Sequence, residues 1–264
     1  MENKKTMVFL ESLPLSCVEW QCQTRTLSKD FHTIAIDLPG FGRSSPLANY
    51  KMKGLSQFYT EQVLYVLKQL KVNKFILVGH ATGGHVAMYL AAKHPDKVEK
   101  LVLIETSPMF SQAKDWPYGF NESERKKYIV SANKNIDEVL KLMTTAALKE
   151  KCDKQKLSIL AKKYYKLAKM AGKNTVLSFF ENLGLEDFRD LLPQIKAPTL
   201  ILWPVLSDEI PRDVVFYMAK KIPNSQLVEI NGMDHFVTDT NASLVNILIS
   251  NFVNPKCDIC DLKV

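Results

Sequence analysis

Short runs of apolar residues alternate along the chain with longer segments in which apolar residues recur every three or four positions. The short runs predict buried strands near residues 7–10, 32–37, 74–79, 101–105, 198–203 and 226–230. The longer segments predict helices near residues 56–70, 84–94, 212–221 and 241–253. Strands that alternate with helices favour an α/β fold with a mostly parallel, doubly wound sheet that is covered on both faces.

One long segment, residues 107–193, interrupts this alternation. Its pattern is helical, and its apolar positions between Leu157 and Ala171 fall on one helical face while most of its lysines fall elsewhere. We therefore predict a helical cap over residues 107–193, inserted into a core made of residues 1–106 and 194–264. A chain of 264 residues with 46% hydrophobic residues is long enough to fill one such core.

The strand predicted at 74–79 continues into a glycine-rich turn, GHATGG, with Ala81 at its centre. Gly79 and Gly83 lie two residues on either side of Ala81, where glycine lets a helix pack closely against the preceding strand. The turn resembles the nucleophile elbow of α/β-hydrolases, whose central residue is the catalytic serine. Ala81 has no hydroxyl group with which to attack a substrate.

Five further segments resemble the same superfamily, in particular its small capped esterases, lactonases and haloperoxidase-like members, and they occur in the same order. They are Val8–Leu15 (third strand and oxyanion loop), Ile34–Ser44 (the D-x-x-G-x-G-x-S turn), Leu101–Pro108 (sixth strand), Pro198–Pro211 (strand and acid loop) and Gly232–Phe236 (histidine loop). Because the first of these strands begins within the first ten residues, the resemblance implies an α/β-hydrolase sheet that lacks the first N-terminal hairpin.

The resemblance also implies a degenerate catalytic triad at Ala81, Ser207 and His235. The spacing between Trp203 and Pro211 places the acid position on Ser207, so Asp208 follows one residue late, and Glu105 lies where some members keep an alternative acid. His235 is the one triad residue retained. The predicted site therefore has a histidine and two possible acids, Asp208 and Glu105, but no serine.

The predicted oxyanion loop is altered too. Its equivalents are Glu11, Ser12, Leu13 and Thr82, with the usual His-Gly replaced by Glu11 and Ser12. A carboxylate at this place would oppose the negative charge that a tetrahedral oxyanion gathers. The backbone N–H donors expected at Leu13 and Thr82 do not depend on side chains.

Several altered catalytic positions favour a catalytically silent α/β-hydrolase homologue, a pseudoenzyme that acts as a partner or subunit of a protein assembly or binds a small ligand. One alternative is a serine hydrolase of small esters, lactones or amides with its nucleophile replaced by Ala81. A second is a serine-independent lyase that uses His235 as its base. Aromatic residues are candidates for a pocket for a small apolar ligand under the cap, or for its packing: Trp116, Tyr118, Phe120, Phe179, Phe180 and Phe236.

The net charge of +7 is concentrated in the predicted cap, since residues 114–173 hold 15 lysines and arginines against 7 aspartates and glutamates. A basic cap of this kind either docks on an acidic surface or presents a solvated lysine face. No nucleic-acid motif accompanies it. The strand at 32–37 is expected at the sheet edge, where a partner protein or a second copy pairs with it unless a local segment covers it.

Five cysteines, an odd and small number, suit a reducing compartment. No apolar stretch approaches the roughly 20 residues of a membrane span, and the N-terminus lacks the apolar core of a signal peptide. We therefore expect a cytoplasmic or organelle-matrix protein with no transmembrane segment. Cys257 and Cys260 form a C-x-x-C with no second pair nearby, so neither a metal site nor a cofactor is expected.

Overall fold

The computed structural model describes residues 4–148, 154–231 and 234–255, without the side chains of residues 154–157. In this part of the chain, six strands form one sheet in the order β2-β1-β3-β4-β5-β6, and every neighbouring pair is parallel. The strands are β1 (Thr6–Leu10), β2 (His32–Ile36), β3 (Phe75–His80), β4 (Val98–Ile104), β5 (Thr199–Pro204) and β6 (Ser225–Ile230). The predicted α/β class with a parallel sheet is confirmed.

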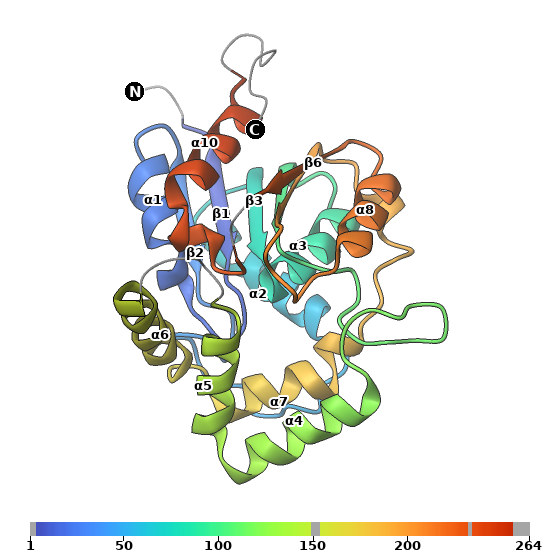
Figure 1. The fold of residues 1–264 in the computed structure, drawn as a ribbon. Helices are drawn as coiled ribbons and strands as arrows, with labels where there is room; N and C mark the ends of the chain where they lie inside the picture. Colours follow the sequence, from blue (N-terminus) through green and yellow to red (C-terminus); the bar gives the residue numbers. More distant parts are fainter. Residues whose placement is uncertain (1–3, 149–153, 232–233, 256–264) are drawn as a thin grey trace.

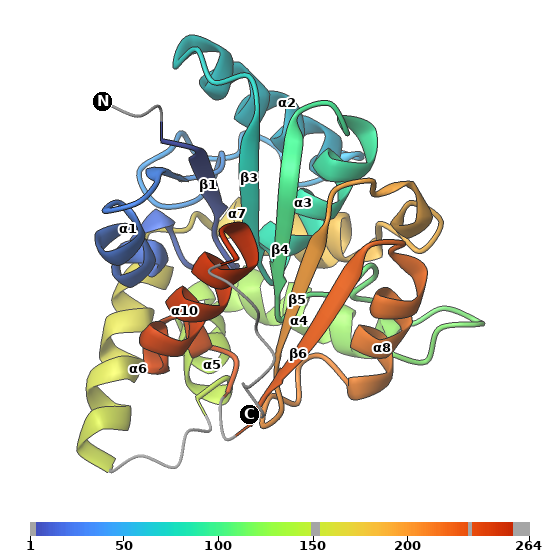
Figure 2. The ribbon, with the colours of Figure 1, turned by 90° about the horizontal axis from the view of Figure 1, so that it is seen from above.

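Helices cover both faces of the sheet, as Figures 1 and 2 show. Alternate residues of each strand point to opposite faces, so both sets must be apolar when both faces are buried. In β1, Val8 and Leu10 belong to a core cluster with α2 (Leu55–Gln69), α3 (Thr82–Lys93) and α8 (Arg212–Lys221). Met7 and Phe9 pack instead with α1 (Gln21–Leu27), α9 (Val237–Thr240) and α10 (Ala242–Val253).

Four helices, α4 (Glu122–Lys134), α5 (Ile136–Ala146), α6 (Lys154–Ala168) and α7 (Lys173–Glu181), form a helical insert between β4 and β5. Figure 1 shows the insert beyond one end of the sheet, and residues from the segments that follow β1, β3, β4 and β5 share a cavity with it. The insert therefore covers the carboxyl ends of the strands, where the predicted site residues lie.

The predicted helices agree with α2, α3, α8 and α10 to within two residues at each end. The short helices η1 (Cys17–Trp20) and α1, which follow β1, are not among the sequence predictions. Two further short helices are η2 (Leu183–Leu185) and η3 (Leu192–Gln194). Among the described helices, none is both long enough and apolar enough to cross a membrane.

Candidate functional site

The turn between β3 and α3 has the geometry of a nucleophile elbow. Ala81 at its apex has φ +46° and ψ −112°, in a region that residues other than glycine rarely adopt. A Cβ atom on Gly79 would lie 2.5 Å from the carbonyl oxygen of Gly83, and one on Gly83 would lie 2.3 Å from that of Leu10. Both glycines are therefore required for the close approach of α3 to the sheet.

The loop after β1 contacts the elbow directly. The Leu13 N–H, one of the two donors expected in the oxyanion hole, donates to the Thr82 hydroxyl at 2.7 Å. That hydroxyl is an internal acceptor that a substrate oxygen would have to displace. Leu13 and Thr82 both line the cavity next to Ala81, so the expected donors are close to the apex, but one of them is already engaged.

Glu11 does not place a charge in the oxyanion hole, and this part of the sequence interpretation is wrong. Its carboxylate is fully buried and accepts the Leu38 N–H at 2.7 Å, while burial raises the pKa of Glu11 well above its usual range. Ser12 donates its N–H and its hydroxyl to Glu19 at 2.9 and 3.1 Å. Glu11 Oε1 and the Ser12 donors are directed to these internal partners, and neither residue lines the cavity.

His235 lies beside two carboxylates. Its Nδ1 is 3.3 Å from Glu209 Oε2 and 3.8 Å from Glu105 Oε1. Burial by itself would lower the pKa of His235, but the carboxylates of Glu209 and Glu105 outweigh burial and raise the pKa to about 9. The imidazole is therefore positively charged at neutral pH.

The acids that contact His235 differ in origin and exposure. Glu105 directly follows β4 with φ +46° and is buried, which raises the pKa of its carboxyl group. Glu209, two residues after the predicted acid position, is half-exposed and was missed by the sequence analysis. Ser207 accepts the Glu209 N–H at 3.3 Å, and Ser207 and Asp208 line the same cavity. The loop therefore brings Glu209 rather than Ser207 to the histidine.

A buried histidine–glutamate pair packs against His235. The rings of His80 and His235 have centroids 4.6 Å apart, and His80 Nδ1 pairs with the carboxylate of Glu19. His85 has no carboxylate partner of this kind: it donates Nδ1–H to the Ser107 carbonyl, and its ring stacks on Phe188. Burial lowers the pKa of His85 to about 4. Glu19 lies far from the elbow in sequence, and no motif marked it.

A cavity of about 530 Å³, here called the cap cavity, lies between the helical insert and the carboxyl ends of the strands. Of the aromatic residues predicted to line it, Tyr118, Phe120, Phe179, Phe180 and Phe236 do so. Trp116 does not: its indole N–H donates to the Met109 carbonyl at 3.2 Å, and its ring packs edge-on against Tyr118 and Tyr217. The sequence analysis missed the lining residues Phe110, Tyr128 and Glu124.

Among the described residues, no group of three or more histidine, cysteine, aspartate or glutamate side chains is arranged to hold a metal ion. Cys257 and Cys260 lie outside the described residues.

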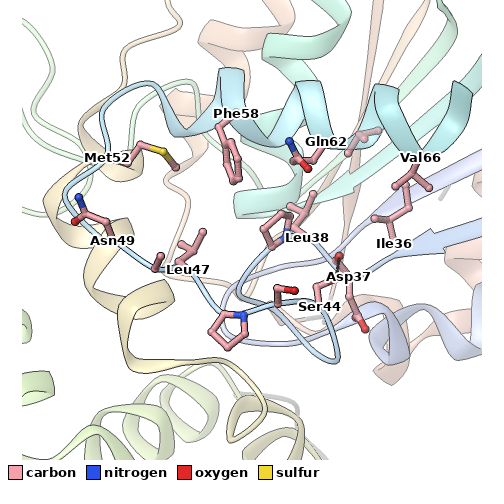
Figure 3. Close-up of a pocket in the computed structure, with 15 residues that line it drawn as sticks. Ile36, Asp37, Leu38, Ser44, Leu47, Asn49, Met52, Phe58, Gln62 and Val66 are labelled. Atoms are coloured by element: carbon pink, nitrogen blue, oxygen red, sulfur yellow. Dashed lines mark hydrogen bonds between the residues drawn. The ribbon is translucent and has the colours of Figure 1, made fainter. Parts of the chain in front are cut away.

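A second cavity of about 550 Å³, here called the edge groove, lies beside β2 (Figure 3). The end of β2 and the loop that follows it form one wall with Ile36, Leu38 and Leu47, and α2 forms the other with Phe58 and Val66. No described strand pairs with the outer side of β2. The His32 N–H donates to the Lys5 carbonyl, so the alternate residues Thr33 and Ala35 direct their backbone groups outward.

Comparisons with known proteins agree with this geometry. A family model described as alpha/beta hydrolase fold matches residues 5–242. The chain is 28% identical over 229 residues to a pimeloyl-[acyl-carrier protein] methyl ester esterase of Citrobacter koseri, covering 83% of this chain and 82% of that protein. Two similar solved structures are a bromoperoxidase from Bacillus anthracis and an enol-lactonase from Burkholderia xenovorans. Their TM-scores are 0.86 and 0.83 at 23% and 20% identity, and each match covers 95% of this chain and 92% of the other. These structural matches show a shared fold.

Proposed function

Since the chain belongs to the alpha/beta hydrolase fold family, we propose that it binds a small, largely apolar ligand beneath its helical insert without hydrolysing it. The observation that carries this proposal is the alanine at the apex of an otherwise complete elbow. A nucleophilic mechanism needs an attacking group within hydrogen-bond reach of its base. At the apex beside the cap cavity, Ala81 supplies only a methyl group.

The cavity is suited to binding. Its volume of about 530 Å³ falls in the range of roughly 300–1,000 Å³ that is usual for small-molecule sites. Its walls are mainly aromatic and aliphatic, and a few polar groups converge near His235. This combination fixes the orientation of a ligand while burying most of its surface.

The chemistry of an acyl-enzyme is opposed at two points. In a serine protease, removal of the serine alone costs on the order of a millionfold in turnover, and the activity left over depends on the oxyanion hole and on binding. Here the Leu13 N–H is occupied by the Thr82 hydroxyl.

The alternative in which His235 is the base of a lyase is not favoured either, because an imidazole whose pKa is about 9 already holds its proton at pH 7.

The test is to expose the wild-type protein to a fluorophosphonate probe and measure its intact mass. We expect no adduct with the wild type and no turnover of short-chain p-nitrophenyl esters above that of the His235→Ala variant, which is the matched control. An adduct, or ester turnover that depends on His235, would contradict the proposal.

A second candidate is a serine hydrolase of small esters, lactones or amides whose nucleophile has been replaced by Ala81. Two observations favour it: the Citrobacter koseri relative is an esterase, and His235 keeps acidic partners. The variant Ala81→Ser separates the two candidates. Under the binding proposal its turnover stays low, because the oxyanion donor at Leu13 remains engaged. Efficient turnover by Ala81→Ser, lost again in Ala81→Ser with His235→Ala, would favour the hydrolase.

We also propose a partner site at the edge groove, occupied by an extended, acidic segment of another protein. Thr33 and Ala35 offer outward backbone groups that a further strand can pair with, and the groove beside them accepts its apolar side chains. Residues 37–74, which include all of the groove residues except Ile36, carry six lysines and arginines against two acidic residues, Asp37 and Glu61. Asp37, the one charged residue among the described residues that line the groove, already accepts the N–H groups of Cys17 and Arg43. The net positive charge of residues 37–74 opposes a second copy of the chain and attracts an acidic segment.

Two fluorescent peptides test this site, one alternating valine with glutamate and one alternating valine with lysine. Fluorescence anisotropy should show binding of the acidic peptide alone. Val66→Glu in the groove wall should weaken that binding by about tenfold, whereas Tyr65→Glu, the neighbouring exposed position outside the groove, should leave it unchanged. Equal binding of both peptides, or dimerisation through this edge in sedimentation, would contradict the proposal.

A further inference from the structure

The cap cavity is acidic although the chain as a whole is basic. Four carboxylates line it, those of Glu105, Glu124, Asp208 and Glu209, and the described lining residues include no lysine or arginine. The one basic group among them is His235. By contrast, the chain has a net charge of +7, and residues 114–173 carry eight more basic than acidic residues. The acidity is therefore a property of the cavity and not of the surrounding surface.

The carboxylates reach the cavity from opposite sides. Glu105 and Glu209 come from the loops after β4 and β5, whereas Glu124 comes from α4 of the helical insert. The Tyr128 hydroxyl shows that the two groups converge: burial raises the pKa of Tyr128, and the charges of Glu209 and Glu124 raise it further. A ligand in the cavity is therefore exposed to negative potential from both the sheet and the insert.

Glu105 adds an independent observation. It is 1% exposed and lines the cavity, and its polar neighbours His235 and Ser207 lie too far away for close hydrogen bonds to its carboxylate oxygens. Its nearest cation is His235, at 3.8 Å. Since His235 is also 3.3 Å from Glu209, one positive imidazole faces two carboxylates. Buried carboxylates are normally hydrogen-bonded or paired. Here Glu105 and Glu209 share a single imidazole, so a second positively charged group would be stabilised beside them.

The remaining walls are aromatic. Seven rings line the cavity: Phe110, Tyr118, Phe120, Tyr128, Phe179, Phe180 and Phe236. Phe120 lies edge-on to Tyr128, Phe179 and Phe180, with centroid separations between 5.4 and 6.2 Å, which fixes the positions of these rings. The face of an aromatic ring carries negative potential and attracts an organic cation. Aromatic walls combined with carboxylates are the chemistry that recognises a substituted ammonium group.

We propose that the cap cavity selects an organic cation, namely a protonated or quaternary amine attached to a small apolar group. This inference rests on the proposed function and names the class of its ligand. The ammonium group lies among the carboxylates and aromatic faces near Glu105, Glu124 and Glu209. The apolar part of the ligand fills the space between Phe179 and Phe236. An anionic ligand of the same size is repelled.

Three probes of similar shape and different charge test the proposal: choline, the uncharged 3,3-dimethylbutanol and the anionic 3,3-dimethylbutanoate. Isothermal titration calorimetry at low ionic strength should show choline binding at least about tenfold more tightly than the alcohol, and no saturable binding of the anion. Added salt should weaken the binding of choline and leave that of the alcohol unchanged. Equal affinity for choline and the alcohol, tighter binding of the anion, or no saturable binding of choline would overturn the proposal.

Glu124→Gln locates the charge effect. It should weaken choline binding about threefold to tenfold without disturbing α4, because glutamine can replace glutamate in the capping box with Asn121. Glu122→Gln, an exposed glutamate on the same helix that does not line the cavity, is the matched control and should bind choline as the wild type does. Equal loss in both variants would overturn the proposal.

The outcomes separate this inference from the proposed function. A fluorophosphonate adduct on the wild type refutes non-hydrolytic binding, whereas the order of affinities among the three probes depends only on the charge of the cavity. If the protein forms an adduct and still prefers choline, the cation site is supported and the proposal of binding without hydrolysis is contradicted.

Discussion

At the scale of single residues, the elbow depends on glycines that leave no room for a side chain. The methyl group of Gly83→Ala would lie 2.3 Å from the Leu10 carbonyl oxygen, which is backbone and cannot move aside easily. We expect this variant to lose about 3 kcal/mol of unfolding free energy, measured by urea denaturation. Gly172→Ala is the control: the nearest atom is 3.9 Å away, so its stability should change by less than about 1 kcal/mol. Similar losses in both variants would show that the elbow is not tightly packed.

The charge on His235 predicts a pH-dependent stability. A folded-state pKa of about 9, above the unfolded value near 6.5, means that the charged imidazole contributes its full stabilisation below pH 6.5 and loses it as the pH rises through 9. Glu209→Gln should therefore be less stable than the wild type at pH 6, by about 1 kcal/mol because Glu209 is half-exposed and water screens the pair.

Urea denaturation of both proteins between pH 6 and pH 10 measures this difference, which should disappear at the alkaline end. NMR titration of His235 should give a midpoint near 9 in the wild type and a lower one in Glu209→Gln. Glu99→Gln, a substitution of an exposed glutamate on β4, should show neither effect. A difference in stability that does not vary with pH would contradict the charge argument.

At the scale of elements, one set of contacts ties the helical insert to the core. Tyr164 on α6 stacks on Phe236 with centroids 3.9 Å apart, and its hydroxyl donates to Asp239 on α9 at 3.0 Å. Lys163 on α6 pairs with the same carboxylate. Because Phe236 follows His235 and lines the cap cavity, these contacts also hold the histidine loop in place.

Tyr164→Phe should lower the unfolding free energy by about 2 kcal/mol, since it removes a buried hydrogen bond to a charged group while keeping the ring stack. It should also speed limited proteolysis within residues 107–193. The control is Tyr165→Phe, because the Tyr165 hydroxyl makes no hydrogen bond within the described part of the chain. If the two variants are equally stable and equally resistant to protease, these contacts do not hold the insert.

The elements themselves were readable from periodicity, because strands buried on both faces are continuous apolar runs and the helices on them keep one apolar face. The helix α1 could not be predicted in this way, because its seven residues, QCQTRTL, are mostly polar and too few to show a helical period. The spacing of glycines around Ala81 predicted the elbow, because the need for residues without a side chain there arises from the turn itself. Glu209, Glu19 and Glu124 carried no such signal, because only the folded chain brings them near His235 or into the cap cavity.

At the scale of the whole molecule, charge is distributed unevenly. The basic residues counted in the sequence lie largely on the helical insert and around the edge groove, while the cap cavity beneath the insert is acidic. Net charge and its position along the chain were available from the sequence. The acidity of the cavity was not, because its four carboxylates come from three separate stretches of the chain. Trp116 shows the same limit, since its place in the core depends on Met109 and Tyr217.

The backbone conformation of Ala81 has a consequence for how this protein can change. A positive φ at a residue with a Cβ costs on the order of 1–3 kcal/mol, and here the neighbouring glycines and the sheet hold it in place. The fold thus keeps the backbone conformation that presents a catalytic nucleophile, although Ala81 is not a nucleophile. A switch between ligand carrier and catalyst would therefore begin from exchange of a side chain on a main chain that is already shaped for either task.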